Sequence, residues 1–193
     1  MPVIVEAIVV TVDPEGRPNV APQGLVFDPA DGPPATVLFR PWRNTATFRN
    51  LEATRAAVAH LTDDALLLAR SAIDLPVSPP LRPATRVPGY RIADAPLAHE
   101  VEVTDVEGSA ERASIRGRVV ATVTGRPWGG LNRARHAVLE AAILATRVHL
   151  TGPGPVLAEY EKLRAIVEKT GGEAEREAMR LLEAHVRRAG GVR

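Results

Sequence analysis

The sequence contains no cysteine, and this absence excludes several kinds of chemistry. Without cysteine there is no disulfide framework, no thiol nucleophile and no sulfur ligand for a metal ion. Long hydrophobic runs are also absent, because the apolar stretch VIVEAIVVTV near the N-terminus is interrupted by Glu6 and Thr11. This stretch is too short to span a membrane, and it lacks the basic start and small-residue cleavage site of a signal peptide. We therefore expect a cytoplasmic protein with no membrane segment.

The chain also lacks an excess of charge of one sign. It has 24 Lys and Arg residues against 23 Asp and Glu residues, a formal net charge of +1. Nucleic acids and anionic lipid surfaces attract proteins with a clear basic excess, so a nucleic-acid partner is disfavoured. All the basic residues except Lys162 and Lys169 are arginines, which makes any single arginine weak evidence for an anion contact.

The first two thirds of the 193 residues have the pattern of short strands separated by turns. Residues 3–12 form a nearly continuous β-branched run, and Pro14 and Gly16 of the following DPEGRP suit the second and fourth positions of a type I turn. Strand patterns recur at NVAPQGLVF, ATVLFR, TRAAVAHL, HEVEVTDV and ERASIRGRVVATVTG, and a short helix is expected at about residues 47–53. Six short strands with mostly antiparallel connections predict a small barrel.

The last third changes to a helical period. Residues 132–150 place apolar side chains on one stripe, a second helix follows the TGPGP break, and a third is expected at about residues 173–188. We therefore predict a barrel domain at residues 1–126 and a C-terminal three-helix unit at residues 127–193. Residues 73–96 contain six prolines, which exclude a helix or a central strand there and predict a long ordered excursion or a lid.

A cluster of cationic and hydroxyl side chains marks the start of the short helix, in RPWRNTATFRNL. A strand that gives way to a helix N-terminus presents unpaired backbone N–H groups and the positive end of the helix dipole, which together favour a phosphate. Arg40 and Arg43 can add charge-assisted hydrogen bonds, and Thr45 and Thr47 can add hydroxyl donors. The alternative is a capped surface helix with ordinary arginines.

Two prolines interrupt another expected strand, in RPNVAPQG. Pro18 and Pro22 cannot donate ladder hydrogen bonds, so neighbouring backbone groups can face a ligand such as the pyrimidine edge of a flavin. The alternative is an edge strand or a bulge.

These segments together resemble a known group of proteins. NVAP, followed by a strand and then T-x-x-N-L-E, is similar to the FMN-binding split barrels, especially their flavin reductase-like branch. The order of RPNVAPQG, RPWRNTATFRNL, HLTDD, NRARHAVLEAAILATRVHL and EKTGGEAE resembles more closely an archaeal and bacterial FMN-binding family of uncharacterised function with a C-terminal helical domain.

The resemblance implies an FMN site and a homodimer with the flavin near the subunit boundary. Asn19, Val20, Ala21 and Gln23 would line the ring and the ribityl chain, Arg43, Thr45 and Thr47 would hold the phosphate, and Asn50 would brace the helix start. One departure is the QG that follows NVAP, where the reductase branch often has a small hydroxyl residue.

The resemblance implies a redox flavoprotein with flavin-dependent oxidoreductase activity and a link to tetrahydromethanopterin metabolism. It identifies neither catalytic residues, nor the electron donor, nor the substrate. A flavin carrier or sensor and a nucleic-acid-binding interaction module are the alternatives. The five histidines show no metal-ligand spacing, so we predict no metal site. Asp63 and Asp64 in HLTDD are expected to cap a helix or, alternatively, to lie near the ligand.

Overall fold

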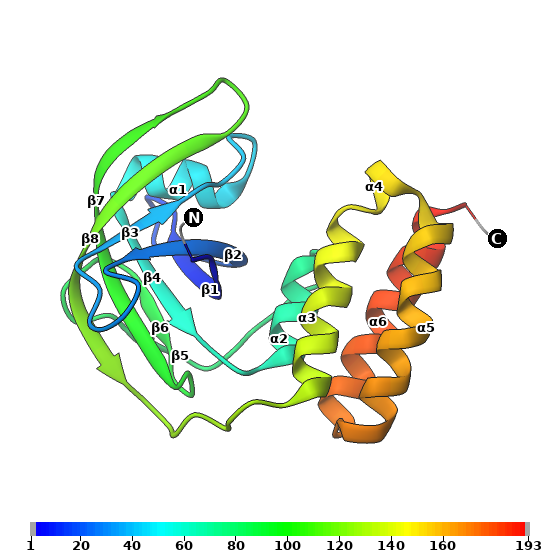
Figure 1. Ribbon diagram of the computed structural model, residues 1–193. Coiled ribbons are helices and arrows are strands. Elements are labelled where there is room, and N and C mark those ends of the chain that lie inside the picture. Colours follow the sequence, from blue (N-terminus) through cyan, green and yellow to red (C-terminus); the bar gives the residue numbers. More distant parts are fainter. Residues whose placement is uncertain (1–2, 192–193) are drawn as a thin grey trace. The chain divides into compact units, whose positions relative to one another are not determined.

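Six antiparallel strands close into a barrel in the order β1, β2, β3, β8, β7, β4 (Figure 1). The structure is a computed structural model that describes residues 3–191. The fold class predicted from the sequence, a six-stranded antiparallel barrel with a C-terminal helical region, is confirmed. The barrel strands are β1 (Val5–Val12), β2 (Pro18–Asp28), β3 (Thr36–Phe39), β4 (Ala56–Leu61), β7 (Leu97–Gly108) and β8 (Ala113–Thr124).

The turn between β1 and β2 is built by local hydrogen bonds, as its sequence predicts. The Asp13 carboxylate accepts hydrogen bonds from the backbone N–H groups of Glu15 (3.1 Å) and Arg17 (2.8 Å). Gly16 has a φ of 80°, which few other residues adopt without strain. This tight turn sets the register in which Thr11 lies opposite Asn19.

The barrel interior is filled by alternate side chains from the strands and by one face of a helix, α1 (Ala46–Thr54). Such alternation follows from the two-residue period of a strand. The fully buried members of this core include Val9, Leu25, Phe39, Leu51, Val101 and Ile115.

The proline-rich segment forms a small hairpin of its own, made of β5 (Leu81–Pro83) and β6 (Tyr90–Ile92). Val87 between these strands packs in a cluster with Ala56, Val58 and Ala98 of the barrel. The segment is therefore an ordered excursion that lies on the barrel and takes no part in the closed sheet.

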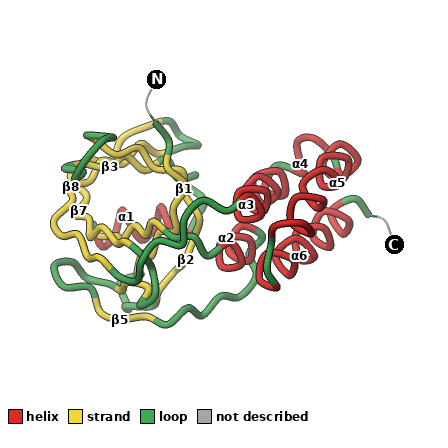
Figure 2. Tube along the Cα trace, turned by 60° about the horizontal axis from the view of Figure 1, so that its bottom comes forward, coloured by secondary structure: helices red, strands yellow, loops and turns green. Residues whose placement is uncertain are grey.

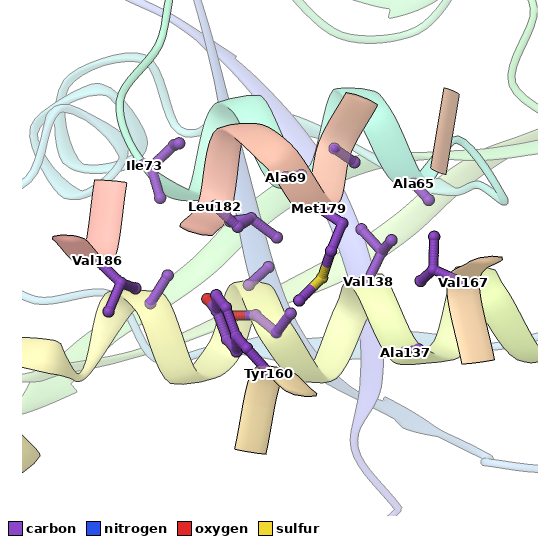
Figure 3. Packing of buried hydrophobic residues seen from close by; sticks show 14 of the residues in the cluster. Ala65, Ala69, Ile73, Ala137, Val138, Tyr160, Val167, Met179, Leu182 and Val186 are labelled. Atoms are coloured by element: carbon purple, nitrogen blue, oxygen red, sulfur yellow. The ribbon is translucent and has the colours of Figure 1, made fainter. Parts of the chain in front are cut away.

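A second unit consists of helices (red in Figure 2): α2 (Ala65–Ala72), α3 (Arg133–Thr146), α4 (Val148–Thr151), α5 (Pro153–Thr170) and α6 (Glu173–Ala189). The barrel unit comprises residues 3–62 and Pro79–Trp128, and the helical unit comprises Asp63–Ser78 and residues 129–191. The predicted three-helix unit thus gains α2, whose segment comes from within the predicted barrel domain. Ala65 and Ala69 of α2, and Ile73 directly after it, are buried against α3 and α6, as Figure 3 shows.

Polar contacts also tie α2 to the rest of the helical unit. Arg135 of α3 binds the buried Asp63 carboxylate at 2.7 Å and Glu175 of α6 at 3.3 Å. Asp64 is the N-cap of α2 and accepts a hydrogen bond from the backbone N–H of Leu67 at 2.9 Å. Both aspartates therefore have structural roles in this unit. No helix within residues 3–191 combines the length and the apolar character needed to cross a bilayer.

Candidate functional site

The N-terminus of α1 lies where the sequence predicted it. Thr45 is the N-cap: its hydroxyl accepts a hydrogen bond from the backbone N–H of Phe48 (3.2 Å) and donates one to the carbonyl of Trp42 (2.7 Å). The first turn of α1, which is described in full, carries no acidic side chain. The positive end of the helix dipole is therefore not compensated by a carboxylate of its own first turn.

A network of amide and hydroxyl groups connects this helix to the barrel strands. The side-chain amide of Asn19 donates to the hydroxyl of Thr47 at 3.1 Å and to that of Thr11 at 3.4 Å. The amide of Asn50 donates to the same Thr11 hydroxyl at 3.1 Å. Thr11, Thr47 and Asn50 are all more than nine-tenths buried, whereas Asn19 is half-buried. We call these four residues the Thr11 network.

The Thr11 network brings together three predicted site residues, Asn19, Thr47 and Asn50, and adds one that sequence reasoning missed. Thr11 is a polar residue in an otherwise β-branched apolar strand, and its buried hydroxyl accepts both amides. The signal that could have identified it is its pairing opposite Asn19 across the predicted hairpin.

One edge of β2 extends beyond its neighbour. Residues 18–25 pair with β1 on one side, whereas β3 pairs with β2 at Val26–Asp28. Alternate backbone groups of residues 18–25 therefore point away from β1 and, among the described residues, meet no strand there. Val20, Ala21 and Gln23 all lie in this stretch and are half-buried. We call residues 18–25 the open edge of β2.

The two predicted arginines occupy different surroundings. The Arg43 guanidinium donates to the carbonyls of Ser109 (2.8 Å) and Glu107 (3.3 Å) near the turn between β7 and β8, and lies 4.8 Å from the centre of the Phe48 ring. Its charge is thus held beside the first turn of α1. Arg40 is exposed at the end of β3, and its carbonyl accepts a hydrogen bond from Arg112 at 3.0 Å. The structure therefore places Arg43 with the helix start but gives Arg40 no contact with the Thr11 network.

A cavity of about 570 Å³ lies at the opposite end of the β1–β2 pair from the Thr11 network. It is lined mainly by apolar groups, among them Val5, Leu61, Pro96 and Trp128. Glu6, which also lines it, pairs with Gly24 next to Gln23. Near its end, at Gly24, the open edge of β2 therefore lies opposite Glu6, which is one of the residues that line the cavity. Asn19 and Gly24 are five residues apart on β2, and five residues of an extended strand span about 17 Å.

Other buried polar groups of the barrel support structure rather than this site. Burial lowers the pKa of His60 to about 4, and burial also lowers the pKa of His99. His99 pairs with the Thr122 hydroxyl at 2.9 Å and lies against Phe27, with ring centres 5.3 Å apart. Within residues 3–191, no three His, Cys, Asp or Glu side chains gather as a metal ligand set.

Family models account for nearly the whole chain. The model described as "Protein of unknown function (DUF447) N-terminal domain" matches residues 5–126, and the one described as "Protein of unknown function (DUF447)" matches residues 132–184. The chain belongs to the DUF447 family. The two matched regions correspond to most of the barrel and to the C-terminal helices.

Solved structures show the same fold. An FMN-bound DUF447 protein from Methanosarcina mazei is 23% identical, with a TM-score of 0.81 and 96% of each chain covered. The 2-nitrobenzoate 2-nitroreductase of Pseudomonas fluorescens is 23% identical, with a TM-score of 0.52, over 64% of this chain and 66% of that one. An FMN-binding protein of Thermus thermophilus, solved with p-hydroxybenzaldehyde, is 23% identical, with a TM-score of 0.51, over 62% and 71%. A search of curated proteins found no significant match.

Proposed function

We propose that this DUF447 protein binds FMN along the open edge of β2 and works as a flavin-dependent oxidoreductase. The observation that carries the proposal is the Thr11 network, because it joins the start of the open edge, at Asn19, to the first turn of α1, at Thr47. A phosphate at the helix start and a flat ring along the strand edge would then belong to one ligand. The FMN-bound relative from M. mazei supports this choice of ligand.

The helix start has the properties that a phosphate monoester requires. Its first turn offers backbone N–H groups, the Thr45 and Thr47 hydroxyls lie there, and no carboxylate of that turn competes with the anion. The Arg43 guanidinium, held by two carbonyls of the β7–β8 turn region, adds positive charge nearby. Asn50 positions the site through Thr11, consistent with the bracing role that the sequence predicts.

The open edge of β2 has the properties that the ring and the ribityl chain require. Asn19, Val20, Ala21 and Gln23 offer half-buried surface, and alternate backbone groups of residues 18–25 meet no neighbouring strand on that edge. A flavin ring combines an apolar body with a hydrogen-bonding pyrimidine edge, so both features are needed. FMN supplies electron and hydride transfer when bound, while the protein supplies orientation and hydrogen bonds.

One finer part of the proposal, a role in the metabolism of tetrahydromethanopterin, rests on the family resemblance alone.

Ultraviolet–visible spectra of the purified protein, followed by titration with FMN and riboflavin, test the cofactor assignment. We expect a flavin spectrum and much tighter binding of FMN than of riboflavin, because only FMN carries the phosphate. Equal affinity for the two flavins would contradict a phosphate site at α1. A colourless protein that binds neither flavin but shifts RNA in a gel would instead support the nucleic-acid alternative.

Anaerobic reduction separates an oxidoreductase from a flavin carrier or sensor. We expect NADH, NADPH or a reduced deazaflavin to bleach the flavin absorbance of the loaded protein within the time of a catalytic assay. If all three donors reduce the flavin no faster than they reduce free FMN, the oxidoreductase proposal fails and the carrier alternative gains support.

We also propose that the functional form is a homodimer. Val3 and Ile4 are 59% and 60% exposed, and Ile4 lies against Gly24 at the end of the open edge of β2. A second subunit would cover these apolar side chains and the outer side of a ring bound there. Sedimentation of FMN-loaded protein should give about twice the 20.7 kDa chain mass. A single species of 20.7 kDa that keeps its flavin would contradict the dimer.

A further inference from the structure

Two arginines face each other on the β5–β6 hairpin, far in the sequence from the residues of the proposed FMN site. Arg82 on β5 and Arg91 on β6 are direct cross-strand partners in an antiparallel pair. Side chains of such a pair lie on the same face about 5 Å apart at Cβ, and two like charges in these positions destabilise the pair. Within residues 3–191, neither guanidinium forms an ion pair with a carboxylate or a side-chain hydrogen bond.

The side chain of Arg91 lacks a hydrogen-bond partner at a buried atom. Its Nε atom is buried and has no hydrogen-bond partner. A buried donor of a charged group without a partner costs at least about 1–3 kcal/mol, so such atoms are rare unless a ligand or water satisfies them. The structure thus combines an unpaired like-charge pair with an unsatisfied donor at the same place.

The hairpin that carries the two arginines is held firmly on the barrel. The buried Glu100 carboxylate accepts hydrogen bonds from the backbone N–H groups of Thr85 (2.8 Å and 3.0 Å) and Arg86 (2.6 Å), and from the Thr85 hydroxyl (3.0 Å). The backbone N–H of Ile92, next to Arg91, donates to Nε2 of His60 at 2.9 Å. Two buried polar groups, Glu100 and His60, therefore fix a strand pair of only three residues each, which keeps Arg82 and Arg91 opposite each other.

We propose that Arg82 and Arg91 bind an oxyanion, the phosphate or carboxylate group of a small molecule. The planar guanidinium fork matches the geometry of both oxyanions, and a bound anion would offset the repulsion between the two like charges. It would also provide an acceptor for Nε of Arg91. This site involves none of the residues assigned to FMN, so it stands whether or not the chain binds flavin.

The side-chain Nε–Hε signals of Arg82 and Arg91 in ¹H–¹⁵N NMR spectra provide the test. Sodium phosphate and sodium acetate are titrated separately into the full-length protein, with sodium chloride keeping the ionic strength constant. We expect a saturable shift of the Arg91 signal, and the anion that saturates at lower concentration identifies phosphate or carboxylate as the preferred group. Anions bound at α1 leave this signal unchanged, so a failure here is distinct from a failure of the FMN proposal.

Three variants separate a built site from general positive charge. In Arg82→Gln, the Arg91 signal is the reporter, and the affinity for the anion should fall about tenfold or more. In Arg91→Gln, the Arg82 signal is the reporter, and the same loss of affinity is expected. Arg86→Gln, a matched control on the same hairpin, should leave the affinity unchanged. Non-saturating shifts that chloride reproduces, or equal weakening by Arg86→Gln, would overturn the proposal. Backbone amide spectra of each variant verify that the hairpin is intact.

Discussion

The hydroxyl groups of Thr45 and Thr47 test the phosphate position at the scale of single residues. A hydroxyl bonded to a charged group contributes about 1.5–3 kcal/mol, and the Thr45 hydroxyl must first release the Trp42 carbonyl, so the T45A/T47A variant should bind FMN at least about tenfold more weakly than the parent. Loss of the Thr45 cap costs about 1 kcal/mol of stability, which a folded domain tolerates. Fluorescence titration of apoprotein with FMN measures the affinity, and circular dichroism verifies the fold.

Thr54→Ala is the matched control for these threonines. Thr54 lies on the same helix, but its hydroxyl donates to the carbonyl of Asn50 at 2.9 Å at the opposite end from the N-cap. We expect the parent affinity in this variant. If a folded T45A/T47A protein also keeps the parent affinity, the assignment of the phosphate to α1 is wrong.

His60 makes the stability of the barrel depend on pH. Its Nε2 accepts a hydrogen bond from Ile92, so Nδ1 carries the proton and donates to the carbonyl of Ile8 at 3.1 Å. Protonation of Nε2 would place its N–H against the backbone N–H of Ile92, so that hydrogen bond would be lost. Burial is the main cause that lowers the pKa of His60 from 6.5 to about 4, with smaller contributions from the charges of His99 and Arg91.

The sign of the effect follows from these two pKa values. The unfolded chain takes up a proton at His60 as the pH falls through 6.5, whereas the folded chain does so only near 4. The stabilising contribution is therefore complete above pH 6.5 and is lost as the pH falls towards 4, by up to about 1.4 kcal/mol per pH unit. Urea unfolding of the parent and of His60→Gln between pH 7 and pH 4 measures this. Equal slopes in the two proteins would contradict it.

At the scale of elements, Glu100 is the main polar anchor of the β5–β6 hairpin. Its carboxylate is fully buried and accepts hydrogen bonds from Thr85 and Arg86 in the hairpin loop. Glu100→Ala leaves these donors without acceptors, which costs about 1–3 kcal/mol for each buried group. We expect the amides of residues 81–92 to exchange with deuterium much faster, while the six barrel strands stay protected.

Glu102→Gln is the control on the same strand. Its carboxylate forms an exposed ion pair with Arg118 at 2.6 Å, and exposed pairs contribute about 0–1 kcal/mol. Hydrogen exchange in the hairpin should be unchanged in this variant. Parent-like protection of the hairpin in Glu100→Ala would show that apolar packing of Val87, and not the carboxylate, holds the segment.

Elements whose signals are local could be predicted from the sequence. The β1–β2 turn and the start of α1 depend on the side chains of Asp13 and Thr45, which bond backbone groups within four residues. Contacts that join distant segments could not be predicted in this way. The carbonyl of Ser109 that binds Arg43 lies 66 residues further along the chain, and no periodicity in either segment indicates that pair.

Contacts between distant segments also decide how much of the candidate site could be predicted from the sequence. The roles of Asn19 and Asn50 are implied by resemblance, and Thr47 is also predicted from the hydroxyl cluster at the helix start. The common acceptor, Thr11, is identified only when β1, β2 and α1 are brought together. Both tryptophans lie at the surface. Trp42 and Trp128 are 51% and 52% exposed, and Trp42 lies 5.2 Å from the Arg112 guanidinium.

At the scale of the whole molecule, the chain builds its helical unit from two separate segments. Asp63–Ser78 leaves the barrel sequence after β4, and residue 129 onwards supplies the remaining helices. The buried side chains of α2 have their partners in α3 and α6, and Asp63 binds Arg135. The helical unit is therefore incomplete without a segment encoded in the middle of the barrel sequence.

This organisation predicts how the chain responds to truncation. A protein that ends at Trp128 keeps α2 but loses α3 and α6, so Ala65, Ala69 and Ile73 lose their cover and should cause aggregation. A second truncated protein, in which a Gly/Ser linker of equal length also replaces Asp63–Ser78, removes that apolar surface. We expect it to be soluble and, because every proposed FMN residue lies in the barrel unit, to bind FMN more tightly than riboflavin. Size-exclusion chromatography and flavin titration of both proteins provide the measurement.

If the two proteins are equally soluble, burial of α2 by the distant helices does not matter for the fold. If the linker protein is folded and binds no flavin, the site requires the helical unit and the proposal of a barrel site is wrong.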